Sequence, residues 1–554
     1  MPTLPKSLNH ALHAAMLVAA ALFLILHATH LTADFPNNSP WMDWSKYTDE
    51  GWYGDAAIRH FQLGHWYVPG DFNPAAALPV WPALEAILFR FTGVSLIAAR
   101  ALTVAVFAGI LICSWFLLRR SSTPQNALPL APAAAVLMLA ASPFCFVFTR
   151  LAILEPLLIL LTLCALLAAG LAHAPASATS TSHRVQILTT LRQNLKPILL
   201  LGVLLPAMVL TKTTALFLVP AIAWMLFSAA NYCLRAFLTI GLPAAALALT
   251  LWLAYFLLVI RPHYLLDYQY LFSANAYTGI TRQNMHFVLI QTLKDGMWMG
   301  SVLYPLALLA TLAACIQFRQ LHARPLIPAL ILWAAGYNAF LAYHNNLQPR
   351  YYLVVAVPLT LLVPVVFESL FLSNPSRRRT LALGYPLAAF LLLAITLPDA
   401  RQTLHFVRHP EYTLVHAAAD VHDYIAHDLL RDPTHNPLVL SISGSDLSLM
   451  TGIHSICDDF GTLELTDRVR QYHPGWYAAW NELDDDKMDA MTPLFHIERV
   501  AAFPAMDDPD RNLLILYRLD DSIETPRRKR RGKPIPRPLR TRVGQQPSTT
   551  QLIH

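Results

Sequence analysis

The feature that most constrains this chain is a series of long apolar segments separated by short polar loops. A helix needs about 20 apolar residues to cross the hydrocarbon core of a bilayer. Charged residues make up only 13% of the chain, against roughly 25% in soluble proteins, so most of the chain must lie in lipid. The predicted spans are 11–30, 96–118, 127–148, 157–173, 197–211, 214–230, 236–260, 298–318, 325–343, 350–373 and 381–398, about 11 transmembrane helices in all.

The acidic residues divide the chain into two regions. Of the 34 acidic residues, 23 lie from Asp399 onward and only 11 precede it. We therefore predict a transmembrane domain at 1–398, with a large first outer loop at 31–95. Apolar residues at helical spacing, followed by short strand-like runs, predict a small soluble α/β domain at 399–523. A basic, Pro- and Arg-rich tail at 524–554 is predicted to be disordered. The net charge of +6 leans on this tail, so nucleic acid is not a predicted partner.

The basic residues of the loops predict the orientation. If the N-terminus lies inside, the inner face receives twelve Lys or Arg residues and one acid, Glu368. The outer face then receives ten basic residues and the other ten acids. An excess of Lys and Arg marks the cytoplasmic face, and an odd number of spans puts the C-terminal domain outside the plasma membrane. The apolar segment 76–91 is short and holds two prolines and two charged residues, so we interpret it as an interfacial helix.

Carboxylates close to hydrocarbon are costly and usually functional, which points to the outer face as the place of chemistry. In the first outer loop, Asp49 and Glu50 are adjacent in an aromatic setting that includes Tyr53. Neighbouring carboxylates perturb each other, so one of them is a candidate general base. The competing interpretation is a solvated turn in which Asp49 caps the following helix. Glu155 lies near Arg150 at the outer mouth between two spans, as a third acid or as part of a structural ion pair.

Cationic and aromatic residues gather at the same predicted face. Lys212 lies between two apolar stretches, where it either snorkels to the surface or holds a lipid phosphate as a point charge. Arg350 opens another span beside His344 and Tyr351. Its guanidinium can grip a phosphate with a bidentate fork, although an interfacial belt would also explain this cluster. Arg261 begins a long Tyr-rich outer loop that is able to fold over a substrate.

Four stretches on this face together resemble a known enzyme family. DEGWYGDAAIRHFQLG, TRLAILEP, LTKTTALFLVP and QPRYYLVVAVP are similar, in this order, to the membrane glycosyltransferases of the GT-C superfamily. The resemblance covers roughly residues 10–400 and is strongest to family 39, the protein-mannosyltransferase-like group that includes the aminoarabinose transferase of lipid A. It implies a GT-C-like membrane fold, a polyprenyl-phosphate sugar donor and transfer outside the inner membrane.

The resemblance also implies roles for individual residues. Asp49, with Glu50 beside it, would match the catalytic acidic motif of the family, and Glu155 stands where members often have Asp. Family members differ over whether a divalent cation takes part, so the resemblance leaves the cofactor unknown. The acceptor does not carry over. The sequence itself has no CxxC or Cys/His cluster of the kind that binds zinc, so we predict no metal ligands.

These observations predict an inverting glycosyltransferase of the EC 2.4 class. It would move a hexose or pentose from a polyprenyl-phosphate donor to a hydroxyl or amine of a lipid, glycan or protein. Asp49 or Glu50 would remove the acceptor proton, and Lys212 and Arg350 would neutralise charge growing on the lipid phosphate. One alternative is a transporter or lipid flippase, although we see no internal repeat and no midplane polar groups. A second is an envelope scaffold or sensor, which would not need the loop acids.

Overall fold

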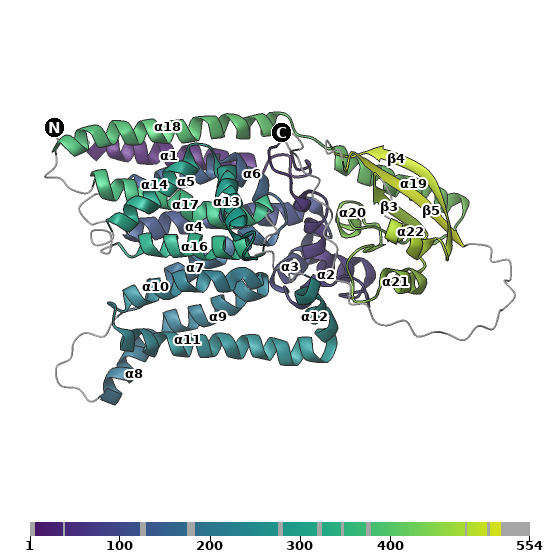
Figure 1. Cartoon of the computed structure of the whole chain (residues 1–554), viewed down its shortest axis with the longest axis horizontal. Coiled ribbons are helices and arrows are strands. Elements are labelled where there is room, and N and C mark those ends of the chain that lie inside the picture. Colours follow the sequence, from purple (N-terminus) through teal and green to yellow (C-terminus); the bar gives the residue numbers. More distant parts are fainter. Residues whose placement is uncertain are drawn as a thin grey trace.

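The structure is a computed structural model that describes residues 6–36, 39–121, 129–173, 183–274, 281–317, 324–344, 348–372, 378–481, 485–506 and 510–521. Figure 1 shows a long bundle of helices with a small sheet-containing domain at one end. Helices α2 (Asp49–Leu63), α3 (Val80–Thr92) and α12 (Leu265–Ala274) lie between the two parts. We call this end of the bundle the domain end. The tail predicted at 524–554 lies outside the described residues.

Each of the eleven predicted spans overlaps an apolar helix. These helices are α1 (Lys6–His27), α4 (Leu96–Ser121), α5 (Ala131–Ala141) with α6 (Pro143–Phe148), α7 (Leu154–Ala169), α9 (Leu195–Thr211), η3 (Thr213–Leu218) with α10 (Val219–Ala229), α11 (Leu234–Tyr255), α14 (Leu303–Ile316), α16 (Leu326–His344), α17 (Pro349–Phe367) and α18 (Arg378–Arg408). Within the described residues, six helices are long and apolar enough to cross a membrane, or eight if each of two bent pairs counts as one span. Three shorter apolar helices, α5, α7 and η3–α10, complete the set. The protein is therefore a multi-pass α-helical membrane protein.

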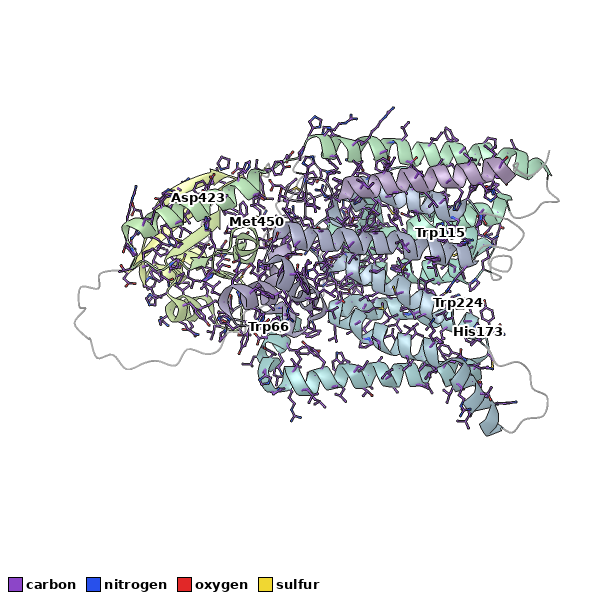
Figure 2. The ribbon with its side chains drawn as sticks, turned by 180° about the vertical axis from the view of Figure 1, so that it is seen from behind. Trp66, Trp115, His173, Trp224, Asp423 and Met450 are labelled. Atoms are coloured by element: carbon purple, nitrogen blue, oxygen red, sulfur yellow. The ribbon has the colours of Figure 1, made fainter. Side chains whose placement is uncertain are left out.

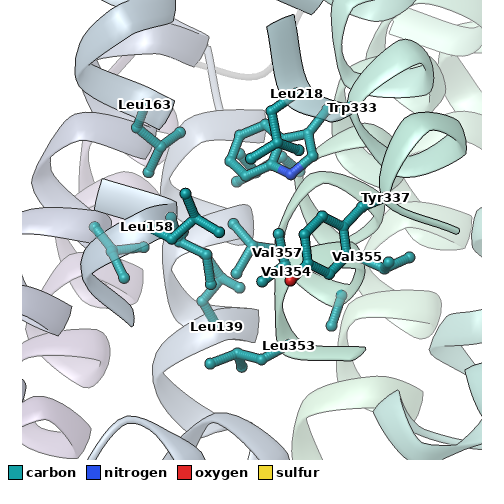
Figure 3. Packing of buried hydrophobic residues seen from close by; sticks show 14 of the residues in the cluster. Leu139, Leu158, Leu163, Leu218, Trp333, Tyr337, Leu353, Val354, Val355 and Val357 are labelled. Atoms are coloured by element: carbon teal, nitrogen blue, oxygen red, sulfur yellow. The ribbon is translucent and has the colours of Figure 1, made fainter. Parts of the chain in front are cut away.

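Helix α17 forms the centre of the bundle. It is the most buried of the six long helices, as expected for a helix that is apolar on all sides. It packs against α5, α7, α14 and α16. In Figure 3, Val354 and Val357 of α17 meet Leu158 of α7 and Trp333 and Tyr337 of α16. Because α17 begins with Pro349 at the domain end, this packing fixes the position of the residues in its first turn.

Helix α3 has the character predicted for an interfacial helix. It spans 13 residues, too few to cross a bilayer, and it is not among the candidate spans of the described residues. Its side chains divide by face, since Trp81 and Phe89 are buried whereas Ile87 and Phe91 are exposed. An exposed apolar stripe on a short helix at the domain end is suited to lie in the membrane surface.

The C-terminal domain is a small α/β unit, as predicted. Its elements are α19 (Thr413–Arg431), β1 (Val439–Leu440), α20 (Gly444–Thr451), β2 (Ser455–Ile456), α21 (Leu465–Tyr472), β3 (Trp476–Trp480), α22 (Asp485–Met491), β4 (Phe495–Pro504) and β5 (Leu513–Asp521). The sheet has the order β2-β1-β3-β5-β4, with β1 parallel to β2 and β3, and β5 antiparallel to β3 and β4. Helix α19 covers the sheet with Leu414, Val421 and Ile425, whose spacing places them on one helical face.

The junction between bundle and domain is tied together by buried polar groups of the first loop. The backbone N–H groups of Leu414 and Val415 donate to the Asp34 carboxylate at 2.8 and 3.2 Å, so a loop residue caps helix α19. Helix α18 runs without a break to Arg408, beyond the domain boundary expected near residue 398. The boundary between the transmembrane domain and the soluble domain at 398/399 stays a prediction.

Candidate active site at the domain end of the bundle

Helix α2 brings the first candidate acid to the junction between bundle and domain. Asp49 and Glu50 occupy its first turn, where the helix dipole favours negative charge. The helix ends at Gly64, whose φ of 78° is readily adopted by glycine. Thr48 stands in the N-cap position, but its hydroxyl makes no capping hydrogen bond and lies 3.0 Å from Asp49 Oδ1. Asp49 is therefore the first residue of the helix and not its cap, contrary to the competing interpretation of the sequence.

Arg350 joins Asp49 to a second carboxylate. Its Nη2 lies 2.8 Å from Asp49 Oδ2, and its Nη1 pairs with Asp43. The backbone N–H of Arg350 also donates to Asp43 Oδ2 at 2.8 Å. All three residues are at most 3% exposed. The guanidinium of Arg350, which lies in the first turn of α17, therefore bridges the two buried carboxylates of Asp43 and Asp49.

Lys212 and Glu155 form a second buried ion pair beside the first. Glu155 lies in the first turn of α7, and Lys212 has an extended backbone at the break between α9 and η3. The ring of Tyr351 contacts both cations, with its centroid 4.0 Å from Lys212 Nζ and 4.7 Å from Arg350 Cζ. Both distances are in the range of cation–π interactions. Two ion pairs, from three helices and the break between α9 and η3, therefore meet around one tyrosine.

Burial sets the electrostatics of this cluster. Desolvation raises the pKa of Asp49 above its ordinary value, and the negative charges of Asp43 and Glu155 act in the same direction, whereas Arg350 opposes the rise. Tyr53 lies one helical turn beyond Asp49, and burial, reinforced by Asp49, raises its pKa well above the usual value. A carboxylate whose pKa is raised is a stronger base than a solvated one.

Glu50 is directed elsewhere. Its Oε1 and Oε2 accept from Arg100 Nε and Nη2 at 2.8 and 2.5 Å, and Oε1 also accepts from the backbone N–H of Ala152. Arg100 in turn donates to the carbonyls of Leu31 and Ala33. Glu50 therefore ties the first loop to α4 and the α6–α7 junction. The Glu50 carboxylate is therefore held by these contacts and not by the Arg350 cluster, and its role as an alternative base stays a prediction.

The remaining candidates lie outside the cluster or at its edge. Arg150 donates to the carbonyls of Thr29 and His30 at 2.7 and 2.6 Å, so it pins the end of α1 and is not the partner of Glu155. Arg261 is exposed on the π-helical segment η4 (Phe256–Tyr264). His344 stacks on Phe340, and its ring centroid lies 6.5 Å from that of Tyr351, at the edge of the cluster. The predicted contacts of Arg150 and Arg261 with substrate thus find no support in their positions.

Sequence reasoning missed Asp43. A signal for it exists, because Asp43 accepts from the backbone N–H of Ser45 at 2.8 Å and so begins the 3-10 turn η1 (Trp44–Lys46), as an Asp-x-Ser pattern favours. Its partner Arg350 is 307 residues away in the sequence, so no local pattern could predict this pairing. Among the described residues, no three or more His, Cys, Asp and Glu side chains are grouped so as to hold a metal ion. Asp49 and Glu155 instead each face a cationic side chain, a donor set that does not suit a divalent cation.

The Glu50→Gln variant should separate a structural from a catalytic role. We expect a loss of about 3–5 kcal/mol in the free energy of unfolding, because Arg100 keeps its buried charge but loses its counter-charge. Turnover per folded molecule should fall by less than about tenfold, since the Arg350 cluster is untouched. Thermal unfolding in detergent and a turnover assay on the same preparation measure both quantities. A stable variant with abolished turnover would contradict the structural assignment.

Known proteins share this arrangement of helices. No protein-family model and no curated protein sequence matched the chain. Among solved structures, ArnT from Cupriavidus metallidurans bound to undecaprenyl phosphate aligns with a TM-score of 0.56 and 15% identity, over 91% of this chain and 98% of that one. The apo state of the same protein gives 0.55 and 14%. The apo oligosaccharyltransferase of Archaeoglobus fulgidus gives 0.51 and 12%, over 92% of this chain and 74% of that one. At these identities the similarity concerns the fold.

Proposed function

Since the chain has the GT-C fold of polytopic membrane glycosyltransferases, we propose that it transfers a sugar from a polyprenyl-phosphate donor to an acceptor hydroxyl or amine. The observation that carries the proposal is the buried cluster at the domain end, where Asp49 meets Arg350 and Glu155 meets Lys212 around Tyr351. A carboxylate can serve as a general base in a displacement at a sugar phosphate, and two cations can stabilise the charge that develops on the leaving phosphate. The similar fold of a protein solved with undecaprenyl phosphate supports the class of donor lipid.

In this mechanism the two cations receive the phosphate of the donor. Arg350 grips two phosphate oxygens with its planar fork, and Lys212 neutralises a third as a point charge. Negative charge grows on this phosphate as the bond to the sugar breaks. Both cations are at most 8% exposed, and an interaction with the phosphate is stronger in such a low-dielectric setting than in water.

Asp49 acts as the general base. It removes a proton from the acceptor while the acceptor atom attacks the anomeric carbon from the side opposite the phosphate. The electron pair of the breaking carbon–oxygen bond leaves with the polyprenyl phosphate. A single displacement of this kind inverts the anomeric configuration. Glu155 is a positioning residue in this scheme, since it holds Lys212.

Donor binding should strengthen the base. Arg350 lies 2.8 Å from Asp49, and its positive charge opposes the rise in the pKa of that carboxyl. A phosphate competes for the same guanidinium, and its negative charge raises the pKa of Asp49 further. Asp49 is therefore a stronger base when the donor is present, which favours proton removal only when the sugar is in place.

The direct test is a reconstituted assay. Purified protein in liposomes receives a polyprenyl phosphate carrying a radiolabelled sugar, together with an extract of envelope lipids and glycans as the source of acceptor. The proposal expects release of polyprenyl phosphate and label in a new product. A transporter or flippase, the alternative function, would move the labelled lipid across the bilayer with its sugar still attached. An envelope sensor would do neither.

We further propose that the N-terminus is cytoplasmic and that the domain end faces outward from the plasma membrane. Cysteine labelling in a variant without the six native cysteines measures this. Asp423→Cys, on the exposed face of α19, should react with an impermeant maleimide in intact cells, whereas Arg235→Cys at the start of α11 should react only after permeabilisation. The opposite pattern would place the cluster in the cytosol and remove the proposed function.

A further inference from the structure

In the C-terminal domain, the edge of the sheet at the carboxyl ends of strands β1 and β2 faces α2. Strands β1 and β2 are parallel, and the segments that follow them begin at Ser441 and Cys457. In open α/β sheets, ligands bind at this edge, outside the carboxyl ends of the strands. Here helix α20, which follows β1, packs on α2 instead. Figure 2 shows Met450 of α20 and Trp66 of the first loop on the two sides of this boundary.

The contacts across this boundary are buried and specific. The Trp52 indole N–H donates to the carbonyl of Ile442 at 3.0 Å, and the Ser445 hydroxyl donates to Asp55 Oδ1 at 2.8 Å. Gly51 allows the closest approach, because a Cβ atom at this position would lie 2.1 Å from the backbone carbon of Ser445. The domain therefore holds the first turn of α2 at backbone distance.

Asp446 lies at the centre of this contact. A Cβ atom at Gly51 would lie 2.2 Å from the backbone nitrogen of Asp446. The Asp446 carboxylate lies close to the backbone N–H of Gly51, one of the first-turn donors of α2 that have no partner within the helix. The hydroxyl of Thr48 does not supply this cap. Asp446 is 2% exposed, and its Oδ2 has no hydrogen-bond partner among the described residues. A buried carboxylate of the C-terminal domain is thus placed beside the first turn of the helix that begins with Asp49.

The surroundings of Asp446 explain how it is tolerated there. Glu50 and Asp49 face it from α2, and Arg100 faces it from α4. Burial raises its pKa well above the ordinary value, and the two acids add to the rise. The charge of Arg100 opposes this rise in the pKa and offsets part of the repulsion between Asp446 and the two acids.

We propose that Asp446 is a positioning residue of the active site, which caps α2 from the C-terminal domain and thereby fixes Asp49 against Arg350. The inference rests on the proposed function. In this arrangement the C-terminal domain forms one wall of the catalytic centre. The edge at the carboxyl ends of its parallel strands, where open α/β sheets bind ligands, contacts α2, the helix that carries Asp49.

The test compares two substitutions in the full-length protein. Asp446→Ala removes the cap, and we expect kcat to fall about fivefold or more with the KM for the donor within about twofold of wild type. Asp446→Asn keeps an acceptor oxygen in the same place, and it should retain kcat within about twofold at neutral pH. Asp423→Ala, an exposed acid of α19, is the matched control and should behave as wild type.

Hydrogen exchange supplies a second readout that does not depend on activity. The amides of the first turn of α2, residues 49–53, should exchange faster in Asp446→Ala and return to the wild-type rate in Asp446→Asn. Wild-type kinetics and exchange in Asp446→Ala would overturn the inference while leaving the proposed function intact. If Asp446→Ala does not fold, the kcat of Asp446→Asn tests the inference. A fall in its kcat as large as that of Asp49→Asn would show that the site needs the charge of Asp446, and this would overturn the capping role. If Asp49→Asn keeps wild-type turnover, the function fails, and exchange alone still tests the cap.

Discussion

Asp49→Asn is expected to lower turnover by about 10²–10⁴-fold, the contribution that a general base usually makes. The substitution keeps the shape of the side chain and its contact with Thr48, so the protein should still insert and fold. What it removes is the acceptor for the proton. Single-turnover assays with saturating donor measure this loss directly, because they separate chemistry from binding.

The pH profile offers a second check on the same residue. Since burial raises the pKa of Asp49 above 3.8, its protonated form persists to higher pH than that of a solvated Asp. Activity should therefore fall on the acid side with an apparent pKa above the usual Asp range, and Asp49→Asn should lose this limb. Because Asp43 and Glu155 interact with Asp49, the apparent pKa belongs to the group of acids. Wild-type turnover in both Asp49→Asn and Glu50→Gln would show that neither acid is the base.

Arg350→Ala should have an effect of similar size through the donor. We expect kcat/KM for the donor to fall by about 10²–10³-fold, the usual loss when one stabilising donor is removed from a developing negative charge. A structural cost accompanies it, because Asp43 and Asp49 lose their shared cation, and an unpaired buried charge costs about 3–5 kcal/mol. Initial rates over a range of donor concentrations, on protein shown to be folded, measure the first effect.

Two matched variants sharpen this experiment. Arg350→Lys restores the charge but not the bidentate fork, so donor use should recover only in part. Arg401→Ala removes an exposed arginine of α18 and should leave donor use unchanged. If Arg350→Ala shows the wild-type dependence on donor concentration, Arg350 does not bind the phosphate.

The positions of the spans, and the placement of several site residues at one end of the bundle, follow from the lengths of the apolar segments and from their alternation across the membrane. Glu155 and Arg350 each begin an apolar helix, and Lys212 ends one, so a consistent alternation of spans brings all three to one face. The same reasoning could not separate Asp49 from Glu50. Adjacent residues on a helix point about 100° apart, and only the partners that lie on each side decide which acid faces the cations.

Other parts of the site depend on pairings that no local pattern records. Asp43 meets Arg350 across 307 residues, and Glu50 meets Arg100 across 50. Arg150 and Glu155 are five residues apart, but their side chains serve different helix junctions. The docking of the C-terminal domain on α2 was equally hidden, since a short run of Ser, Gly and Asp residues reads as an ordinary loop.

The capping of α19 by Asp34 has a consequence for biogenesis. Asp34 and Thr413 are separated by 379 residues, so at a synthesis rate of roughly 5–20 residues per second about 20–75 s pass before the two can meet. During this interval the first loop, which contains Asp34 and Asp49, has already been synthesised, while the start of α19 that contacts it has not. The first loop and the C-terminal domain can therefore make these contacts only when translation nears its end, and chains that stall earlier lack them.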